Sequence, residues 1–189
     1  VTGYTVSIDN ELYKETDFTF SGDATVKGTD AGVYGMTLKS ADFANTNANF
    51  SNVEFVIVDG TLTIAKRSVT LTSATDSKVY DGTALTNDEV TVGGDGFATG
   101  EGATYDVTGS QTDVGSSENA FTYELNDGTK AANYTITTTK GTLKVTELTD
   151  KVTVTITENS GSEKYDGTEK TVTGYTVSID NELYKETDF

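Results

Sequence analysis

Apolar and polar residues alternate along much of the chain, and threonine is the commonest polar partner. An alternation with period two places successive side chains on opposite faces, as in a half-buried β-strand. Threonine is β-branched and suits the solvated face of such a strand. Five alternating runs therefore predict strands, with apolar positions Val69 and Leu71; Phe121, Tyr123 and Leu125; Leu62 and Ile64; Leu143 and Val145; and Val152, Val154 and Ile156.

Glycine-containing turn sequences separate these runs. Asp59-Gly60 and Lys140-Gly141 each stand between two apolar alternations, which predicts tight hairpins in which glycine supplies a positive φ. Asp81-Gly82 and Asp166-Gly167 each follow a tyrosine and predict further turns. A single helical turn is expected only within 40–49 and 129–133. A full helix is not expected in either stretch, because neither has an apolar stripe long enough for one.

The chain is therefore predicted to be all-β. Short strands with frequent turn signals, in units of about 85–100 residues, indicate tandem small β-sandwich domains of the immunoglobulin-like type. A small β-grasp-like domain is the alternative, and it requires a helix that the sequence does not predict.

A literal repeat sets the organisation of the chain. Residues 1–18, VTGYTVSIDNELYKETDF, recur without a change at residues 172–189, an offset of 171 residues. Internal repeats of this kind are typical of arrays. Two readings remain open for it: near-identical tandem copies in a longer parent protein, or an overlap at the two ends of a fragment.

A second, diverged repeat lies inside the 171-residue unit. One pair of matching segments is Val79-Tyr80-Asp81-Gly82-Thr83 and, 85 residues later, Lys164-Tyr165-Asp166-Gly167-Thr168. Four further pairs match in order: 29–32 with 112–115, 49–51 with 133–135, 60–64 with 141–145, and 69–72 with 152–156. The predicted domains are 1–67, which lacks its first strand or strands; 68–150, which is complete; and 151–189, which begins the next repeat.

These motifs resemble those of a known group of domains. Tyr-Asp-Gly-Thr after the first strand, and Asn-(Phe/Tyr) followed by Gly-Thr-Leu-x-(Ile/Val) at the domain end, are similar to the YDG or MBG repeats of bacterial surface, adhesin-like proteins. The resemblance implies a repeated extracellular spacer at the bacterial cell surface or cell wall, with no catalytic residues to assign. The chain departs from the family in having no proline.

Composition narrows the chemistry further. The 189 residues include no His and no Cys, which removes the commonest proton-transfer side chain and every thiolate nucleophile or ligand. A net charge of −17 disfavours nucleic acid and anionic membranes as partners. No apolar run approaches the roughly 18 residues needed to span a bilayer. Carboxylate pairs could still carry out glycoside hydrolysis, so composition does not strictly exclude an enzyme.

Several candidate sites have a structural explanation as well as a functional one. The Tyr-Asp-Gly-Thr motifs are candidates for calcium binding, but they are also explained as residues that build turns. The acidic loop residues are calcium candidates too, and a solvated surface is their alternative explanation; they are Asp23, Asp30, Asp95 and Asp113. Lys151 or Lys164 would supply the amine of an internal isopeptide bond, but the last strand offers no Asn partner. Asn49-Phe50-Ser51 and Asn133-Tyr134-Thr135 fit the glycosylation pattern, although equivalent positions suggest a structural Asn before the last hairpin.

No catalytic, cofactor-binding or metal-binding residue is therefore assigned, and no cofactor is expected. The expected function is a structural stalk or filament, and the alternative is an adhesin repeat that binds a host glycan or protein with avidity from many copies. The expected partners are neighbouring copies of the same repeat. They would lie in the same chain, or in a head-to-tail array in which residues 151–189 of one molecule complete residues 1–67 of the next.

Overall fold

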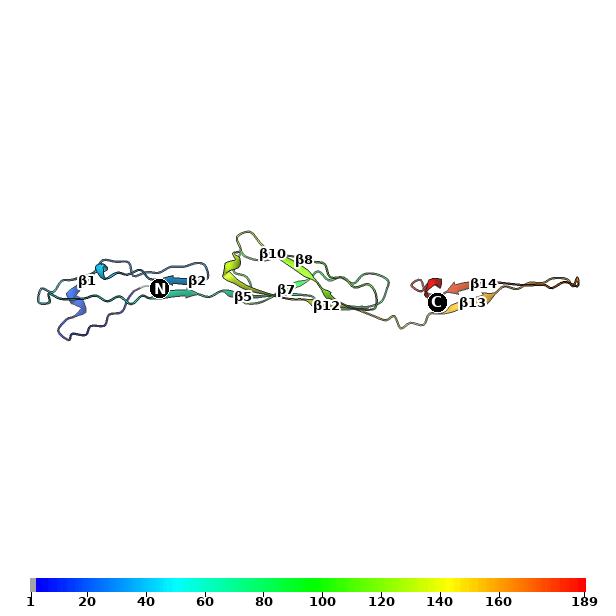
Figure 1. Ribbon diagram of the computed structural model, residues 1–189, viewed down its shortest axis with the longest axis horizontal. Coiled ribbons are helices and arrows are strands. Elements are labelled where there is room, and N and C mark those ends of the chain that lie inside the picture. Colours follow the sequence, from blue (N-terminus) through cyan, green and yellow to red (C-terminus); the bar gives the residue numbers. More distant parts are fainter. Residues whose placement is uncertain (1–2) are drawn as a thin grey trace. The chain divides into compact units, whose positions relative to one another are not determined.

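The computed structural model describes residues 3–189 and confirms the all-β class (Figure 1). Fourteen strands lie in this range, and the helical residues form four 3-10 turns of three residues each. The strands are β1 Phe18–Phe20, β2 Gly32–Gly35, β3 Phe43–Asn45, β4 Thr61–Ile64, β5 Arg67–Ser73, β6 Asp76–Val79, β7 Val90–Gly94, β8 Ala103–Val107, β9 Gly115–Asn119, β10 Phe121–Leu125, β11 Tyr134–Thr139, β12 Gly141–Thr146, β13 Val154–Glu158 and β14 Tyr175–Ile179. The helical turns are η1 Glu15–Asp17, η2 Ser40–Asp42, η3 Ala131–Asn133 and η4 Glu186–Asp188.

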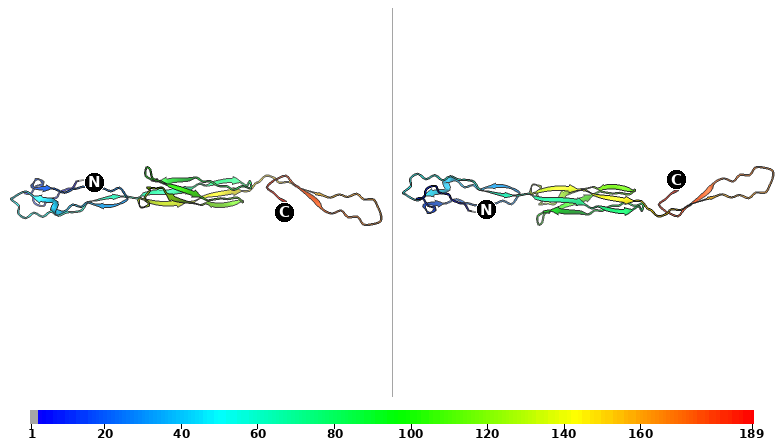
Figure 2. Two further views of the ribbon diagram at one scale, coloured as in Figure 1. Left: turned by 90° about the horizontal axis from the view of Figure 1, so that it is seen from above. Right: turned by 90° about the horizontal axis from the view of Figure 1, so that it is seen from below.

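Two compact units divide the chain. The first contains the residues up to Leu71 together with 91–104 and 123–139, and it holds the antiparallel pairs β1–β3 and β2–β4. The second contains 72–90, 105–122 and 140–189, in which β12 pairs in parallel with β6 and antiparallel with β9, and β13 pairs antiparallel with β14. Two more sheets have the orders β11-β5-β7 and β10-β8 (Figure 2). The second predicted repeat is divided between the two units, and the first unit also contains the first predicted repeat. The units therefore do not coincide with the repeats, and the repeat boundaries stay a prediction.

The best-buried side chains lie on β5 and β12. Val69, Leu71 and Leu143 are 0% exposed and Val145 is 1% exposed. Leu143 and Val145 pack with Leu85, and Tyr80 covers this cluster. Both strands alternate in burial as their sequences predict, since β5 buries every second residue from Val69 to its end.

All five predicted strands are present. β4, β5, β10 and β12 contain the apolar positions that predicted them. β13 begins at Val154, so Val152 lies just before the strand. The helix that a β-grasp domain needs is absent from residues 3–189, and face-to-face sandwich packing stays a prediction.

The two predicted glycine hairpins at Gly60 and Gly141 are wrong. Neither glycine has a positive φ. At Gly141 the chain does not fold back on itself: β11 belongs to the sheet of β5, whereas β12 pairs with β6 and β9. Glycine is required there because a Cβ atom would lie closer than 3.0 Å to the backbone of Ser73 and Ala74. By contrast, Gly82 and Gly167 have φ values of 76° and 81°, so the turns predicted at both are confirmed.

A buried polar network surrounds this change of sheet. Ser73 Oγ accepts a hydrogen bond from the Gly141 N–H at 2.9 Å and donates one to the Asn119 carbonyl at 2.6 Å. Asn119 Nδ2 donates to the carbonyls of Ala74, at 3.0 Å, and Asn87, at 2.8 Å. These bonds pair the buried polar side-chain atoms of Ser73 and Asn119, except for Asn119 Oδ1, which has no hydrogen-bond partner within residues 3–189. The network therefore joins the ends of β5 and β9 to the start of β12.

Helical turns are more frequent than predicted. η2 and η3 lie where single turns were expected, but η1 and η4 were missed. In three of the four, an Asp three residues after a Lys accepts the backbone N–H of that Lys at 2.8 Å: Lys14–Asp17, Lys39–Asp42 and Lys185–Asp188. Side-chain capping of this kind needs no apolar stripe, which is why the hydrophobic pattern did not reveal it.

The register of two strand pairs follows the diverged repeat. Gly32 faces Ile64 in the β2–β4 pair, and Gly115 faces Val145 in the β9–β12 pair. The sequence repeat matches Gly32 with Gly115 and Ile64 with Val145. The two stretches thus correspond in strand pairing as well as in sequence.

Candidate functional site: a clasp between predicted repeats

A small polar cluster connects the first predicted repeat to the second within one compact unit. Lys130 Nζ lies 2.8 Å from Asp30 Oδ2 and 3.0 Å from Oδ1. Asn133 Nδ2 donates to Asp30 Oδ1 at 3.0 Å, and the Ala31 N–H donates to Asn133 Oδ1 at 2.8 Å. We call Asp30, Ala31, Lys130 and Asn133 the clasp. Both ends of the Asn133 amide are used, so its orientation is determined by its partners.

Local structure positions both sides of the clasp. Asp30 lies just before β2, and its carbonyl accepts a hydrogen bond from the Tyr34 hydroxyl at 2.8 Å. Lys130 directly precedes η3 and Asn133 is its last residue, and the Asn133 N–H donates to the Lys130 carbonyl at 2.9 Å. One helical turn brings side chains three residues apart to the same side. The single turn η3 thus presents an ammonium group and an amide together to the carboxylate of Asp30.

The electrostatics of the clasp favour its charged form. Hydrogen bonds from Lys130 and then Asn133 lower the pKa of Asp30, and the hydrogen bond to Asp30 raises the pKa of Lys130. The two side chains are 43% and 62% exposed, respectively. Exposed ion pairs contribute little to stability because water and salt screen them. The clasp is therefore suited to setting the geometry of a junction rather than to stabilising either repeat.

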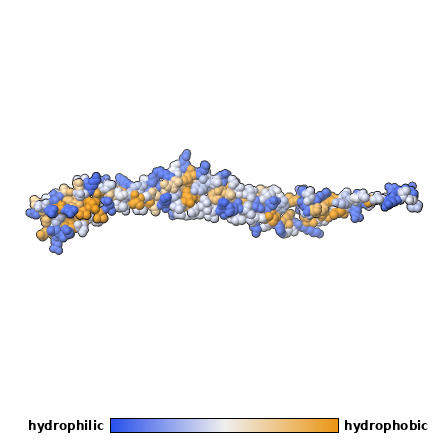
Figure 3. Space-filling view, viewed as in Figure 1, coloured by the Kyte–Doolittle hydropathy of each residue, from blue (hydrophilic) through white to orange (hydrophobic). Residues whose placement is uncertain are grey.

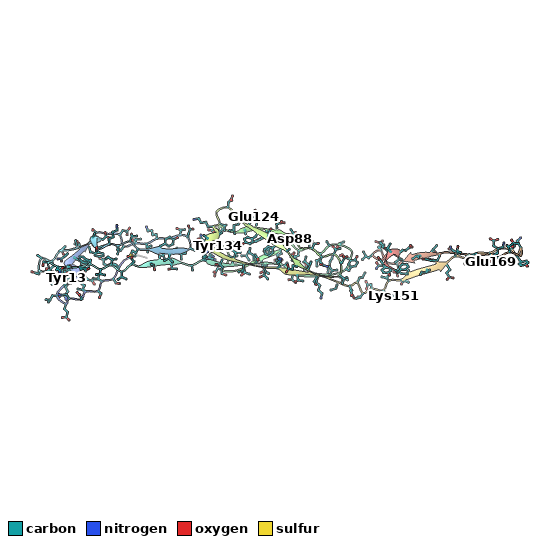
Figure 4. All side chains as sticks on the ribbon, viewed as in Figure 1. Tyr13, Asp88, Glu124, Tyr134, Lys151 and Glu169 are labelled. Carbon is teal, nitrogen blue, oxygen red and sulfur yellow. The ribbon has the colours of Figure 1, made fainter. Side chains whose placement is uncertain are left out.

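The segment 95–101 is held in place beside the clasp. Arg67 Nε donates to the Gly96 carbonyl at 2.9 Å, and Arg67 Nη2 donates to the Asp95 carbonyl. Tyr134, which directly follows Asn133, donates its hydroxyl to Glu101 Oε2 at 2.5 Å (labelled in Figure 4). Its ring packs edge-on against Phe97, with centroids 5.2 Å apart. Burial, and then the hydrogen bond to Glu101, raise the pKa of Tyr134.

Removing the Asn133 amide should open the clasp without unfolding the chain. In Asn133→Ala the Ala31 N–H loses its acceptor, so we expect its hydrogen exchange to accelerate by about tenfold or more. Exchange measured by NMR for individual amides checks this. The matched control is Asn49→Ala, which changes the counterpart Asn of the first repeat, an exposed residue. Unchanged exchange at Ala31 in Asn133→Ala would show that the clasp is not formed in solution.

The two Tyr-Asp-Gly-Thr motifs build turns. Asp81 Oδ1 accepts the Thr83 N–H at 2.9 Å and the Thr83 hydroxyl at 2.8 Å, and Asp166 makes the same two bonds to Thr168 at 3.0 and 2.7 Å. Aspartate side chains commonly close turns by such bonds to residue i+2. The tyrosines differ: Tyr80 packs on the Leu85 cluster, whereas Tyr165 is 97% exposed.

Lysine adds to the electrostatics of the first of these turns. Lys78 Nζ lies 2.7 Å from Asp81 Oδ1. Hydrogen bonds from Lys78, and then from the N–H and hydroxyl of Thr83, lower the pKa of Asp81 to about 2.

The stability of this turn should depend on pH in a defined window. Because the pKa of Asp81 is lower in the folded chain, its contribution is fully present above the ordinary value of 3.8. It is lost as the pH falls from there through about 2. A carboxyl-carbon NMR titration checks the pKa, and Lys78→Met should move it upward toward 3.8. A value of 3.8 in both proteins would contradict the hydrogen bonds described here.

The four acidic loop residues do not form one site. Asp30 belongs to the clasp, and Asp95 Oδ2 accepts the Ser68 N–H at 2.8 Å. The Asp113 carbonyl accepts a bond from Gln111 Nε2 at 2.7 Å, and Asp23 lies on a separate loop. Among residues 3–189, no three acidic side chains are grouped so as to hold a metal ion.

The remaining candidate residues have different surroundings. Asn133, in the second glycosylation pattern, uses its side-chain nitrogen in the clasp, whereas Asn49 is exposed. Asn133 has the structural role that was expected, but it bridges to Asp30 and Ala31 instead of introducing a hairpin. Both lysines considered for isopeptide chemistry, Lys151 and Lys164, are exposed.

Lys130, and the partnership of Asn133 with Asp30, were not predicted from the sequence. A recurring signal was present: Lys-x-x-(Asp/Asn)-(Phe/Tyr) occurs at 14–18, 39–43, 130–134 and 185–189, and each marks a single helical turn. It locates the turns but does not say which loop lies opposite them.

A scan against protein-family models and searches of curated proteins and of solved structures each found no match. No helix within residues 3–189 is both long and apolar enough to cross a membrane. The resemblance to YDG or MBG repeats thus rests on the motifs alone.

Proposed function

We propose that this chain is a structural repeat segment of an extracellular stalk or filament in a bacterial surface protein, without catalytic activity. The observation that supports this most strongly is the unchanged recurrence of 18 residues at an offset of 171. The diverged inner repeat, with its matching strand registers, adds to it. Selection for one catalytic site does not explain the recurrence of these segments, whereas selection for length does.

The proposed mechanism is geometric. Each repeat contacts mainly the repeats before and after it, so stability is approximately a sum over units and their junctions. The clasp is one such junction contact, because Asp30 and Lys130 belong to successive predicted repeats. A net charge of −17 favours an extended, soluble surface through self-repulsion. Adding repeats would then lengthen the stalk without redesigning it.

Small-angle X-ray scattering tests the proposal. The 189-residue chain is compared with a polypeptide extended by one further 171-residue unit. The longest strand, β5, has 7 residues, and at about 3.4 Å per residue it spans about 24 Å, so two added repeats should raise the maximum dimension by at least about 48 Å. An added unit that thickens the particle without lengthening it would contradict a stalk.

A glycan array separates the stalk from the adhesin alternative. A spacer should give no signal above background, whereas selective binding that strengthens with copy number would favour direct adhesion by the repeat.

A further inference from the structure

The beginning and the end of the second predicted repeat are joined by one pair of strands. β5 ends at Ser73 and β6 begins at Asp76, so the two strands are nearly continuous, and β12 is the last strand of the repeat. β6 and β12 pair in parallel, with Asp76 facing Leu143 and Val79 facing Thr146. Both strands belong to the same compact unit.

The parallel pairing determines how tension along the chain would load these two strands. Tension would enter β6 at its N-terminal end, from β5, and would leave β12 at its C-terminal end, toward residue 150. In a parallel pair these two points lie at opposite ends of the pair, so the strands are pulled past one another along their length. The hydrogen bonds between them then have to break together. In a hairpin pulled at its two open ends, each bond would instead carry the load in turn.

Side-chain and backbone bonds hold this pair at both of its ends. At the N-terminal end, Thr75 Oγ1 accepts a hydrogen bond from the Thr142 N–H at 3.0 Å. At the C-terminal end, Thr146 Oγ1 donates to the Lys78 carbonyl at 3.2 Å, and the Tyr80 N–H donates to the Thr146 carbonyl at 2.8 Å. All three bonds cross directly between the two segments that tension would separate.

The buried polar network lies where tension would pass from β5 into β6. Ser73 Oγ bridges the Gly141 N–H and the Asn119 carbonyl, and Asn119 Nδ2 donates to the Ala74 carbonyl. Ser73 and Asn119 are 1% and 0% exposed, and a hydrogen bond is stronger where water is excluded. The network thus ties the N-terminal end of the pair to β9, the other neighbour of β12.

Apolar packing shields one face of the pair from water. Leu143 and Val145 of β12 are buried and pack with Leu85, and Tyr80 covers this cluster. Hydrophilic and neutral residues dominate the visible surface over this part of the chain (Figure 3). Exclusion of water from one side strengthens the strand hydrogen bonds, so the packing favours a pair that resists sliding.

We propose that the parallel β6–β12 pair is a load-bearing clamp, which keeps the second repeat folded when the chain is under tension. This function goes beyond the proposed stalk, because a spacer can supply length without bearing load. The clamp acts on the rate of unfolding, since forced unfolding is governed by the barrier to unfolding and not by equilibrium stability.

Single-molecule stretching of the full chain in two directions tests the clamp. Handles can be attached at chosen cysteines without background, because the chain has no Cys. Lys66→Cys with Asp150→Cys, both at exposed positions, pulls along the chain and slides β6 past β12. Val79→Cys with Glu147→Cys, also at exposed positions, pulls on the two C-terminal ends and peels the same pair apart.

The unfolding force should be at least about twofold higher along the chain than across the pair, because only the first direction loads all the bonds together. The length released, at about 3.3–3.6 Å for each residue between the handles, identifies the unfolding event as that of the second repeat. An equal or lower force along the chain would overturn the clamp.

Matched variants test whether the bonds of this pair carry the load. Thr75→Val and Thr146→Val together remove two hydroxyl groups from the pair with little change in shape. They should speed unfolding under a constant force along the chain by about tenfold or more. Ser117→Ala is the control: it removes a hydroxyl that donates to the Ser110 carbonyl at 3.0 Å, outside the β6–β12 pair, and should change that rate much less.

Circular dichroism checks that each variant is folded before it is stretched. A folded double variant that unfolds no faster than the unmodified chain would overturn the clamp. If the force does not depend on direction but added repeats still lengthen the particle in X-ray scattering, the stalk proposal stands and only the clamp fails.

Discussion

Replacing Leu71 by alanine should lower the free energy of unfolding by about 3–4 kcal/mol, the range for a fully buried leucine that leaves a cavity. Leu71 is 0% exposed on β5, between the equally buried Val69 and Ser73. Ile156, an apolar residue of β13, is 55% exposed, so Ile156→Ala should cost under about 1 kcal/mol in the same measurement.

Urea unfolding followed by tyrosine fluorescence and circular dichroism checks this pair of variants. The transition of the second repeat must be separated from the others, because a chain of several units need not unfold in one step. Equal effects of the two substitutions would contradict the burial difference.

Gly141→Ala should be the second large effect, at about 3 kcal/mol, the upper part of the range for overpacking. The added methyl group would meet the backbone of Ser73 and Ala74, which cannot move aside as a flexible side chain could. It would also disturb the hydrogen bond from the Gly141 N–H to Ser73 Oγ.

Gly60→Ala is the matched control, because Gly60 is the sequence counterpart of Gly141 and has no heavy atom within 4 Å of a built Cβ. Its φ is not positive, so alanine should be neutral or slightly stabilising there. Thermal unfolding by calorimetry measures both. A tolerated Gly141→Ala would mean that β5 and β12 do not approach as closely as described.

The prediction of these elements from sequence succeeded where the cause is local. A period of two in Val69–Leu71 and Leu143–Val145 required only that alternate side chains face opposite sides of a strand. Asp81-Gly82 and Asp166-Gly167 predicted turns for an equally local reason. Within the candidate site, Asp30 was considered as a calcium ligand and Asn133 as a glycan attachment site. Neither was predicted to be the partner of the other.

The same reasoning failed at Gly141 because local signals were ambiguous. A glycine between two alternations is consistent with a hairpin, but it is equally consistent with a strand that passes close to another backbone. Only the position of Ser73 and Ala74 distinguishes the two. The clasp could not be predicted for a similar reason, since nothing in the sequence near Lys130 specifies that a carboxylate 100 residues away lies opposite η3.

By itself the sequence determined the all-β class, the positions of five strands, the turns at Asp81-Gly82 and Asp166-Gly167, and the 171-residue period, because these depend on backbone preferences and on identity between segments. Only the tertiary structure decided which strands pair, why Gly141 must be glycine, that Asn119 is buried in a polar network, and that Asp30 meets Lys130. These depend on contacts between residues far apart in the chain, and such contacts leave no periodic signal in a single sequence.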